Sequence, residues 1–125
     1  MGRLLARYQR DLRGGTAVEY ALVLPIFITL MVGTMCVANL SFAINSLHFA
    51  VEDAARCAAV KTTVCTDSGA TVSYAQGRYS GPQISANFSY SATGCGHTVS
   101  ASGSYPIILA AATLNVPISA SACYP

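Results

Sequence analysis

The stretch that decides the fold is residues 20–51, YALVLPIFITLMVGTMCVANLSFAINSLHFAV, which contains no charged side chain. As an α-helix, a run of this length would extend about 48 Å at 1.5 Å per residue. The hydrocarbon core of a bilayer requires about 20 residues, and the most apolar part, residues 20–38, satisfies that length. The run therefore predicts one helix that spans a membrane and continues beyond it.

The charges are distributed unevenly on either side of this run. Residues 1–14 hold four arginines and one aspartate, a net charge of +3, whereas residues 15–125 sum to −1. The positive-inside rule therefore places the N-terminus in the cytoplasm and the rest of the chain outside. A nucleic-acid-binding protein would carry a basic face on its folded part, so we expect no nucleic-acid partner.

The start of the helix carries a recognisable signal. Residues 16–19, Thr-Ala-Val-Glu, match the S/T-x-x-E capping box, which predicts a helix from about residue 16 to about residue 62. Pro25 lacks the backbone N–H of a helix interior, so we expect a kink there.

The part of the helix outside the membrane has an apolar face and charged residues elsewhere. Glu52 and Arg56 are spaced as an i,i+4 ion pair. Apolar residues recur at helical spacing at Leu47, Val51, Ala54 and Ala58. This face is expected to pack against another element.

The C-terminal half of the chain alternates apolar and polar residues in three runs, 84–90, 98–105 and 113–122. Such alternation predicts half-buried antiparallel strands. The apolar members expected on one face are Ile84, Ala86, Phe88 and Tyr90, then Val99, Ala101, Gly103 and Tyr105, then Leu114, Val116, Ile118, Ala120 and Ala122. This face should pack on the alanine-rich helix.

Other features refine the predicted sheet. Pro117 cannot donate to a ladder, so the last strand should be an edge strand. Residues 71–74 are a candidate for a fourth, weaker strand, within residues 65–83 that otherwise resemble a loop.

The expected fold class is α+β: a long N-terminal membrane-spanning helix whose C-terminal half carries an antiparallel sheet of three or four strands. The expected organisation is a basic cytoplasmic leader at 1–14, a transmembrane helix at 15–42, an external amphipathic helix at 43–62 and a sheet domain at 63–125.

Four of the five cysteines lie in the part of the chain expected outside the cytoplasm, where disulfides form. Four cysteines allow three pairings, and the sequence alone does not choose among them. Proximity along the chain favours Cys57 with Cys65 and Cys95 with Cys123.

The sequence contains no recognisable catalytic or metal-binding pattern. Cys95 and His97 are close in sequence, but no third ligand is spaced to complete a metal site. No nucleophile–base pair or pair of catalytic carboxylates is recognisable. The sequence therefore predicts a non-enzymatic protein without cofactor, metal or small-molecule substrate.

Residues 13–27, RGGTAVEYALVLPIF, resemble the N-terminus of TadE-like proteins, the pilin-like components of the bacterial tight adherence, or Flp, pilus system. The resemblance rests on Gly14, Glu19 and Tyr20, which match the G-x-x-x-x-E-Y pattern of that family. It implies cleavage between Gly14 and Gly15 by a prepilin peptidase on the cytoplasmic side. It also implies a protein of the bacterial inner membrane with other pilin-like subunits as partners and a role in adhesion.

Such a cut would give Glu19 a partner. A charged carboxylate in a bilayer costs about 2.5–3.5 kcal/mol, and the new α-amine of Gly15 would offset much of this cost, within one helix or between subunits. A buried charge pair of this kind can set the register of an assembly.

Two other interpretations remain open at this stage. One is an uncut, membrane-anchored periplasmic binding or structural domain, in which Glu19 caps the helix. The other is a secreted protein cut by signal peptidase before Asn39, although its apolar segment exceeds the usual 7–15 residues.

Overall fold

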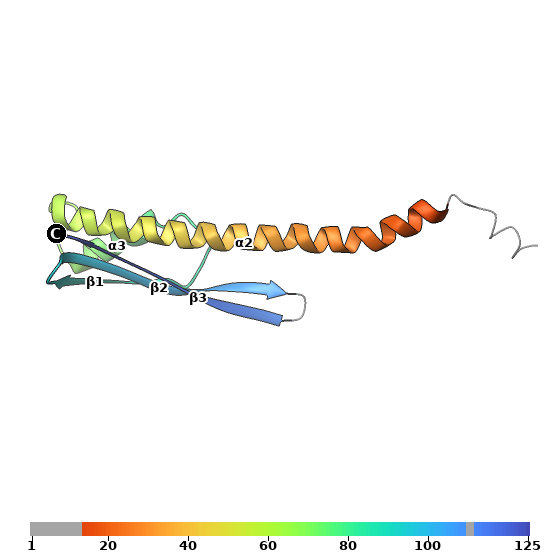
Figure 1. Ribbon diagram of the computed structural model, residues 1–125. Coiled ribbons are helices and arrows are strands. Elements are labelled where there is room, and N and C mark those ends of the chain that lie inside the picture. The colour runs from red at the N-terminus through yellow and green to blue at the C-terminus, as the bar shows by residue number, and fades with distance from the viewer. Residues whose placement is uncertain (1–13, 110–111) are drawn as a thin grey trace, which may run out of the picture. The chain divides into compact units, whose positions relative to one another are not determined.

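The computed structural model describes residues 14–109 and 112–125 and has the predicted α+β fold (Figure 1). Of the predicted leader, residues 1–14, residues 1–13 with the four arginines lie outside the described residues. The elements are α2 (Gly14–Val60), α3 (Ser68–Arg78), β1 (Asn87–Thr93), β2 (Gly96–Leu109) and β3 (Ala112–Tyr124). Contacts divide the chain into two units that meet within α2, between Cys36 and Val37.

Helix α2 is already helical at Gly14, where the described residues begin. The prediction of a capping box at residues 16–19 was therefore wrong, because Thr16 lies inside the helix and not at its N-cap. Pro25 also lies inside α2, and the helix continues past it. At the other end α2 stops at Val60, and the Lys61 amide donates to the Cys57 carbonyl at 2.8 Å as the chain turns away.

The predicted apolar face of the external helix is confirmed. Leu47, Val51 and Ala54 are at most 1% exposed. They form one hydrophobic core with residues of the two longer strands, namely Val99, Ala101, Ile118 and Ala120. A smaller cluster at the C-terminal end of α2 contains Cys57, Ala58 and Cys65. Burying this apolar surface is the main favourable contribution to folding of the external unit.

The sheet has three antiparallel strands in the order β1-β2-β3. The prediction that Pro117 lies on an edge strand is confirmed, because β3 is the last strand and Pro117 faces Ser104 of β2. The polar members of the strands lie on the exposed face, where Ser100 and Ser121 form a cross-strand hydroxyl pair at 3.1 Å. Such pairs add modest stability to a sheet.

The β2–β3 ladder is longer than the β1–β2 ladder. Strand β1 pairs with β2 only as far as Asn87 opposite Ser102, whereas β2 and β3 stay paired from there to Leu109 opposite Ala112. We call the two-stranded extension, residues 103–108 with 113–118, the arm. The predicted burial of Leu114 was wrong, because it lies on the arm and is 55% exposed.

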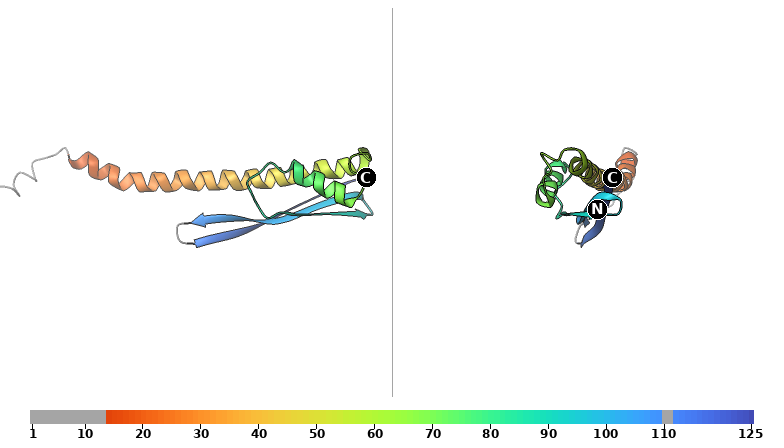
Figure 2. Two further views of the ribbon diagram at one scale, coloured as in Figure 1. Left: turned by 180° about the vertical axis from the view of Figure 1, so that it is seen from behind. Right: turned by 90° about the vertical axis from the view of Figure 1, so that its left-hand side faces the viewer.

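The arm points away from the chain's C-terminus. In Figure 1 and in the left view of Figure 2, the end of β2 and the start of β3 lie at the other end of the sheet from the C-terminus.

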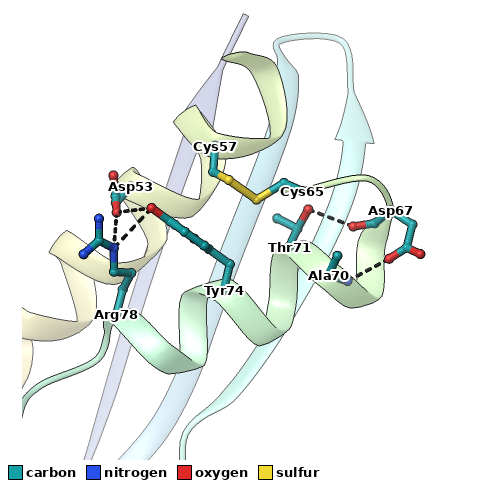
Figure 3. The surroundings of a disulfide bond; sticks show 8 residues. All are labelled: Asp53, Cys57, Cys65, Asp67, Ala70, Thr71, Tyr74 and Arg78. Carbon is teal, nitrogen blue, oxygen red and sulfur yellow. Dashed lines mark hydrogen bonds and ion pairs between the residues drawn. A yellow bond between two sulfur atoms is a disulfide. The ribbon is translucent and has the colours of Figure 1, made fainter. Parts of the chain in front are cut away.

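The segment predicted as a loop contains α3, and the suggestion of a strand at residues 71–74 was also wrong. Asp67 is the N-cap: its Oδ1 accepts from the Ala70 amide at 2.7 Å, and its carbonyl accepts from the Thr71 hydroxyl at 2.8 Å (Figure 3). Thr71 and Ala75, one turn apart, are buried. Two glycines and two β-branched residues weaken the intrinsic helix propensity, so the cap and tertiary packing decide this helix.

Helix α3 is attached to α2 by a polar cluster of Asp53, Tyr74 and Arg78. Among the described residues, the ion pair joins Arg78 Nε and Asp53 Oδ2 at 2.6 Å, and the Tyr74 hydroxyl donates to the same oxygen at 2.9 Å (Figure 3). Hydrogen bonding to Tyr74 and the charge of Asp53 raise the pKa of Arg78 above its ordinary value. Arg78 therefore remains charged and holds α3 to α2.

Both disulfides in the structure belong to this external unit. Cys57 is joined to Cys65, which ties the C-terminal end of α2 to the chain just before α3 (Figure 3). Cys95 is joined to Cys123, which ties the β1–β2 turn to the end of β3. Cys36 is free and half-buried.

Gly103 occupies a position where the chain approaches itself closely. A Cβ there would lie 2.9 Å from the Ser85 carbonyl oxygen and 3.1 Å from the Ala86 Cα, both backbone atoms that cannot rotate away. We expect Gly103→Ala to destabilise the external unit by about 1–3 kcal/mol. Guanidinium unfolding followed by near-ultraviolet circular dichroism of the tyrosines measures this change. The control is Gly94→Ala, where a Cβ would meet nothing within 4 Å; equal stability of the two variants would contradict the packing.

The two disulfides should differ in their contributions to stability because they close loops of different length. The sequence separations are 8 and 28 residues. Loop-closure entropy predicts that replacing Cys57 and Cys65 by serine costs about 2.5 kcal/mol, and replacing Cys95 and Cys123 about 3.6 kcal/mol. Unfolding midpoints of the two double variants test the order. A larger loss for the Cys57–Cys65 pair would show that local packing outweighs loop length.

Candidate processing and assembly segment

The residues singled out by the sequence pattern lie together in the first turns of α2. Side chains from residue 15 to residue 25 are exposed, and Tyr20 is 74% exposed. Glu19 is exposed as well. An exposed carboxylate and phenol beside an apolar helix are available to another molecule.

Gly15 shows no requirement for glycine inside the chain. A Cβ at this position would meet nothing within 4 Å, and no left-handed backbone torsion is found there. Glycine is about 1 kcal/mol less favourable than alanine in a helix, so Gly14 and Gly15 make the start of α2 easier to open.

The helix brings Gly15 and Glu19 onto one face. They are four residues apart, so one turn, about 6 Å along the axis, separates them. A positive charge created at the Gly15 nitrogen would therefore lie within reach of the Glu19 carboxylate. At this distance two opposite charges attract strongly once lipid or protein replaces water around them.

Two threonines in the apolar run satisfy their hydroxyl groups on the helix itself. Thr29 Oγ1 donates to the Pro25 carbonyl at 2.7 Å, and Thr34 Oγ1 donates to the Met31 carbonyl at 2.8 Å. Serine and threonine hydroxyls in a helix commonly donate to a backbone carbonyl three or four residues earlier. The bonds leave the apolar run without an unpaired hydroxyl at these positions, as a bilayer requires.

Helix α2 is long and apolar enough to cross a membrane. Its most apolar 18-residue window contains no side chain buried within the protein, and among the described residues α2 is the one helix that meets these criteria. A core helix of a globular protein would be mostly buried. These observations support membrane anchoring through α2.

The remaining candidate residues belong to the external unit. The four paired cysteines are structural crosslinks there. His97, considered above as a metal ligand, has its Nδ1 2.7 Å from the Tyr90 hydroxyl, and the two rings stack. Within residues 14–109 and 112–125, no group of three histidine, cysteine or acidic side chains is placed to hold a metal ion.

The same segment is similar to a known protein family. Residues 14–56 match the TadE-like protein family. The match confirms the resemblance found in the sequence. It lies entirely within α2, begins at Gly14 and includes Glu19, Tyr20 and Pro25. No curated protein and no solved structure matches the chain.

The TadE-like match indicates a protein associated with the Tad pilus, with pilus-related partners in general. All three strands and the four paired cysteines lie outside the matched segment. The part of the chain that resembles the TadE-like family is therefore helix α2 alone.

Proposed function

We propose that this chain is a minor pilin or pilus-assembly protein of a bacterial Tad pilus. It is anchored in the inner membrane by α2 with the sheet unit on the periplasmic side. A prepilin peptidase cuts it between Gly14 and Gly15, and the mature chain then joins or primes a filament that supports adhesion.

The observation that carries this proposal is the start of the TadE-like match at Gly14, the residue before the proposed cut. Two structural facts support it. Gly15 has no internal reason to be glycine, and Glu19 and Tyr20 are exposed one turn further along. Recognition of this segment by an enzyme or by another subunit would explain these features together.

The proposed cut changes the electrostatics of the segment. Before cleavage Glu19 carries an isolated negative charge beside an apolar helix, and arginines precede it in the sequence. After cleavage the arginines are lost and an ammonium group stands at Gly15. This group pairs with Glu19 of the same subunit during anchoring or of a neighbour during assembly.

Two alternatives are distinguished by the same measurement. An uncut anchored domain retains its arginine-rich start, and a secreted protein begins at Asn39. The TadE-like match runs continuously across residue 39, which favours retention of the whole of α2 in one protein.

Mass spectrometry of the N-terminus of the protein from its native membrane tests the processing. We expect a mature chain that begins at Gly15. Gly14→Leu should abolish the cut, because a large side chain replaces the glycine before the cleaved bond. Gly33→Leu is the matched control, since a Cβ at Gly33 of α2 also meets nothing within 4 Å; it should be processed normally. A native chain beginning at Met1 or Asn39 would refute the proposal.

The role of Glu19 is tested separately from processing. We expect Glu19→Ala to be cut normally but to lower incorporation into pili, or pilus number, by about tenfold or more, which corresponds to about 1.4 kcal/mol. The loss follows from an ammonium group left without its carboxylate. Glu52→Ala is the control, because Glu52 is also an exposed glutamate on α2. Normal pilus formation by Glu19→Ala would show that Glu19 does not act in assembly.

A further inference from the structure

The arm ends in an apolar tip, which we define as the exposed Ile108 and Leu114 together with the partly buried Ile107. Ile108 is 75% exposed and Leu114 is 55% exposed. Ile107 is paired with Leu114 on one face of the ladder, while Ile108, opposite Thr113, lies on the other. Apolar side chains on both faces do not fit a strand that packs on a core with one face and meets water with the other.

Residues of α2 and of the strands that line the same grooves show how the arm lies relative to the external part of α2. Phe49 and Arg56 line the same groove as Ser121 and Tyr124 at the end of β3. His48, one turn earlier than Glu52, lines a hollow with Ala101. Moving along β3 toward the arm therefore corresponds to moving along α2 toward lower residue numbers.

The segment between α3 and β1 makes further contacts that follow the same direction along α2. The Ser80 amide donates to the Ser46 hydroxyl at 2.9 Å, which fixes this segment on α2. Tyr79 and Ser85 of the same segment line a hollow with Pro106 at the base of the tip. The tip thus lies beyond the level of Ser46, on the side where α2 enters its apolar run.

The lengths of the two elements show how far the tip extends. The seven residues that follow Ala101, up to Ile108, span about 24 Å of β2. Val37 lies eleven residues before His48, about 17 Å along α2. The tip therefore extends at least to the level of Val37, at the outer end of the most apolar stretch.

The charges of the external unit are at its opposite end. After Arg78 the sequence contains no Asp, Glu, Lys or Arg up to Pro125. The charged residues of the unit lie on the C-terminal turns of α2, in the turn that follows and on α3, at Glu52, Asp53, Arg56, Lys61, Asp67 and Arg78. The unit therefore has a charged end, at the C-terminal turns of α2, and an uncharged arm at its other end.

We propose that the apolar tip of the arm inserts into the outer leaflet of the membrane that α2 crosses, as a second contact of the external unit with lipid. This inference rests on the membrane anchoring in the proposed function. The insertion is shallow, at the boundary between headgroups and acyl chains, because the arm has two unpaired strand edges that cannot enter hydrocarbon. Pro106 and Pro117 remove one edge donor each.

Single-tryptophan fluorescence tests the insertion, because the chain contains no tryptophan. The full chain is reconstituted into phospholipid vesicles as Ile108→Trp, Leu30→Trp or Val64→Trp. These positions are 75%, 65% and 53% exposed, so a larger side chain fits without repacking. Quenching is measured with lipids brominated near the glycerol end or near the methyl end of their acyl chains.

We expect Ile108→Trp to be quenched several-fold more strongly than Val64→Trp, and most strongly by bromines near the glycerol end. Leu30→Trp, in the middle of the apolar run, should be quenched most by bromines near the methyl end. If only Leu30→Trp is quenched, the arm does not insert, although α2 does. A blue-shifted but unquenched Ile108→Trp would mean that protein, such as a second copy, covers the tip. If Leu30→Trp is not quenched, membrane anchoring fails, and the arm proposal fails with it.

Discussion

Small side chains on one face of α2 determine how the external unit is built. Ala43, Ala50 and Ala54 are completely buried, so the sheet can approach the helix closely. Leu47 and Val51 lie between them and contribute most of the volume on the helix side. A larger residue at an alanine position would push the sheet away and leave voids around its neighbours, at a cost of a few kcal/mol. The hydrogen bonds and disulfides secure an arrangement that this packing already defines.

The attachments around this core compensate for its small size. The polar cluster of Asp53, Tyr74 and Arg78 fixes α3 on α2, and the Cys57–Cys65 disulfide closes the turn between them. The Cys95–Cys123 disulfide joins the β1–β2 turn to the end of β3. A small apolar core alone supplies little net stability, which is why small domains outside the cytoplasm use such crosslinks.

The sequence predicted the features that depend on strong periodicity. The helical spacing of Leu47, Val51, Ala54 and Ala58 and the alternation in the three strands identified the core correctly, because burial imposes both periods. Helix α3 was missed because its glycines and β-branched residues have low helix propensity. Its stability comes from the Asp67 cap and from packing. Burial of Leu114 was predicted incorrectly for a related reason. Alternation shows which face a side chain occupies but not where the neighbouring element ends.

The candidate site was predictable only where a pattern specifies residues. Gly14, Glu19 and Tyr20 were found from their spacing, which the TadE-like match includes. The capping box at Thr16 matched by chance, because two further residues at the start of α2 are helical. The Asp53–Arg78 pair joins residues 25 positions apart in sequence, and the helical spacing that suggested Glu52 with Arg56 carries no information about such a distant contact.

Anchoring and assembly make opposite demands on the apolar surface of this chain. In the membrane, lipid covers α2 and, in our proposal, the tip of the arm. A subunit that enters a filament loses both lipid contacts together, so its new neighbours have to cover the helix and the tip. A subunit whose tip stayed uncovered would leave Ile108 and Leu114 in water, at a cost of about 1.5–3 kcal/mol for each fully transferred side chain. In the proposed function an ion pair between the Gly15 amine and Glu19 aligns the helices, but such a pair would not offset this cost. Release from the membrane should therefore be coupled to docking on a neighbour that offers an apolar surface for the arm.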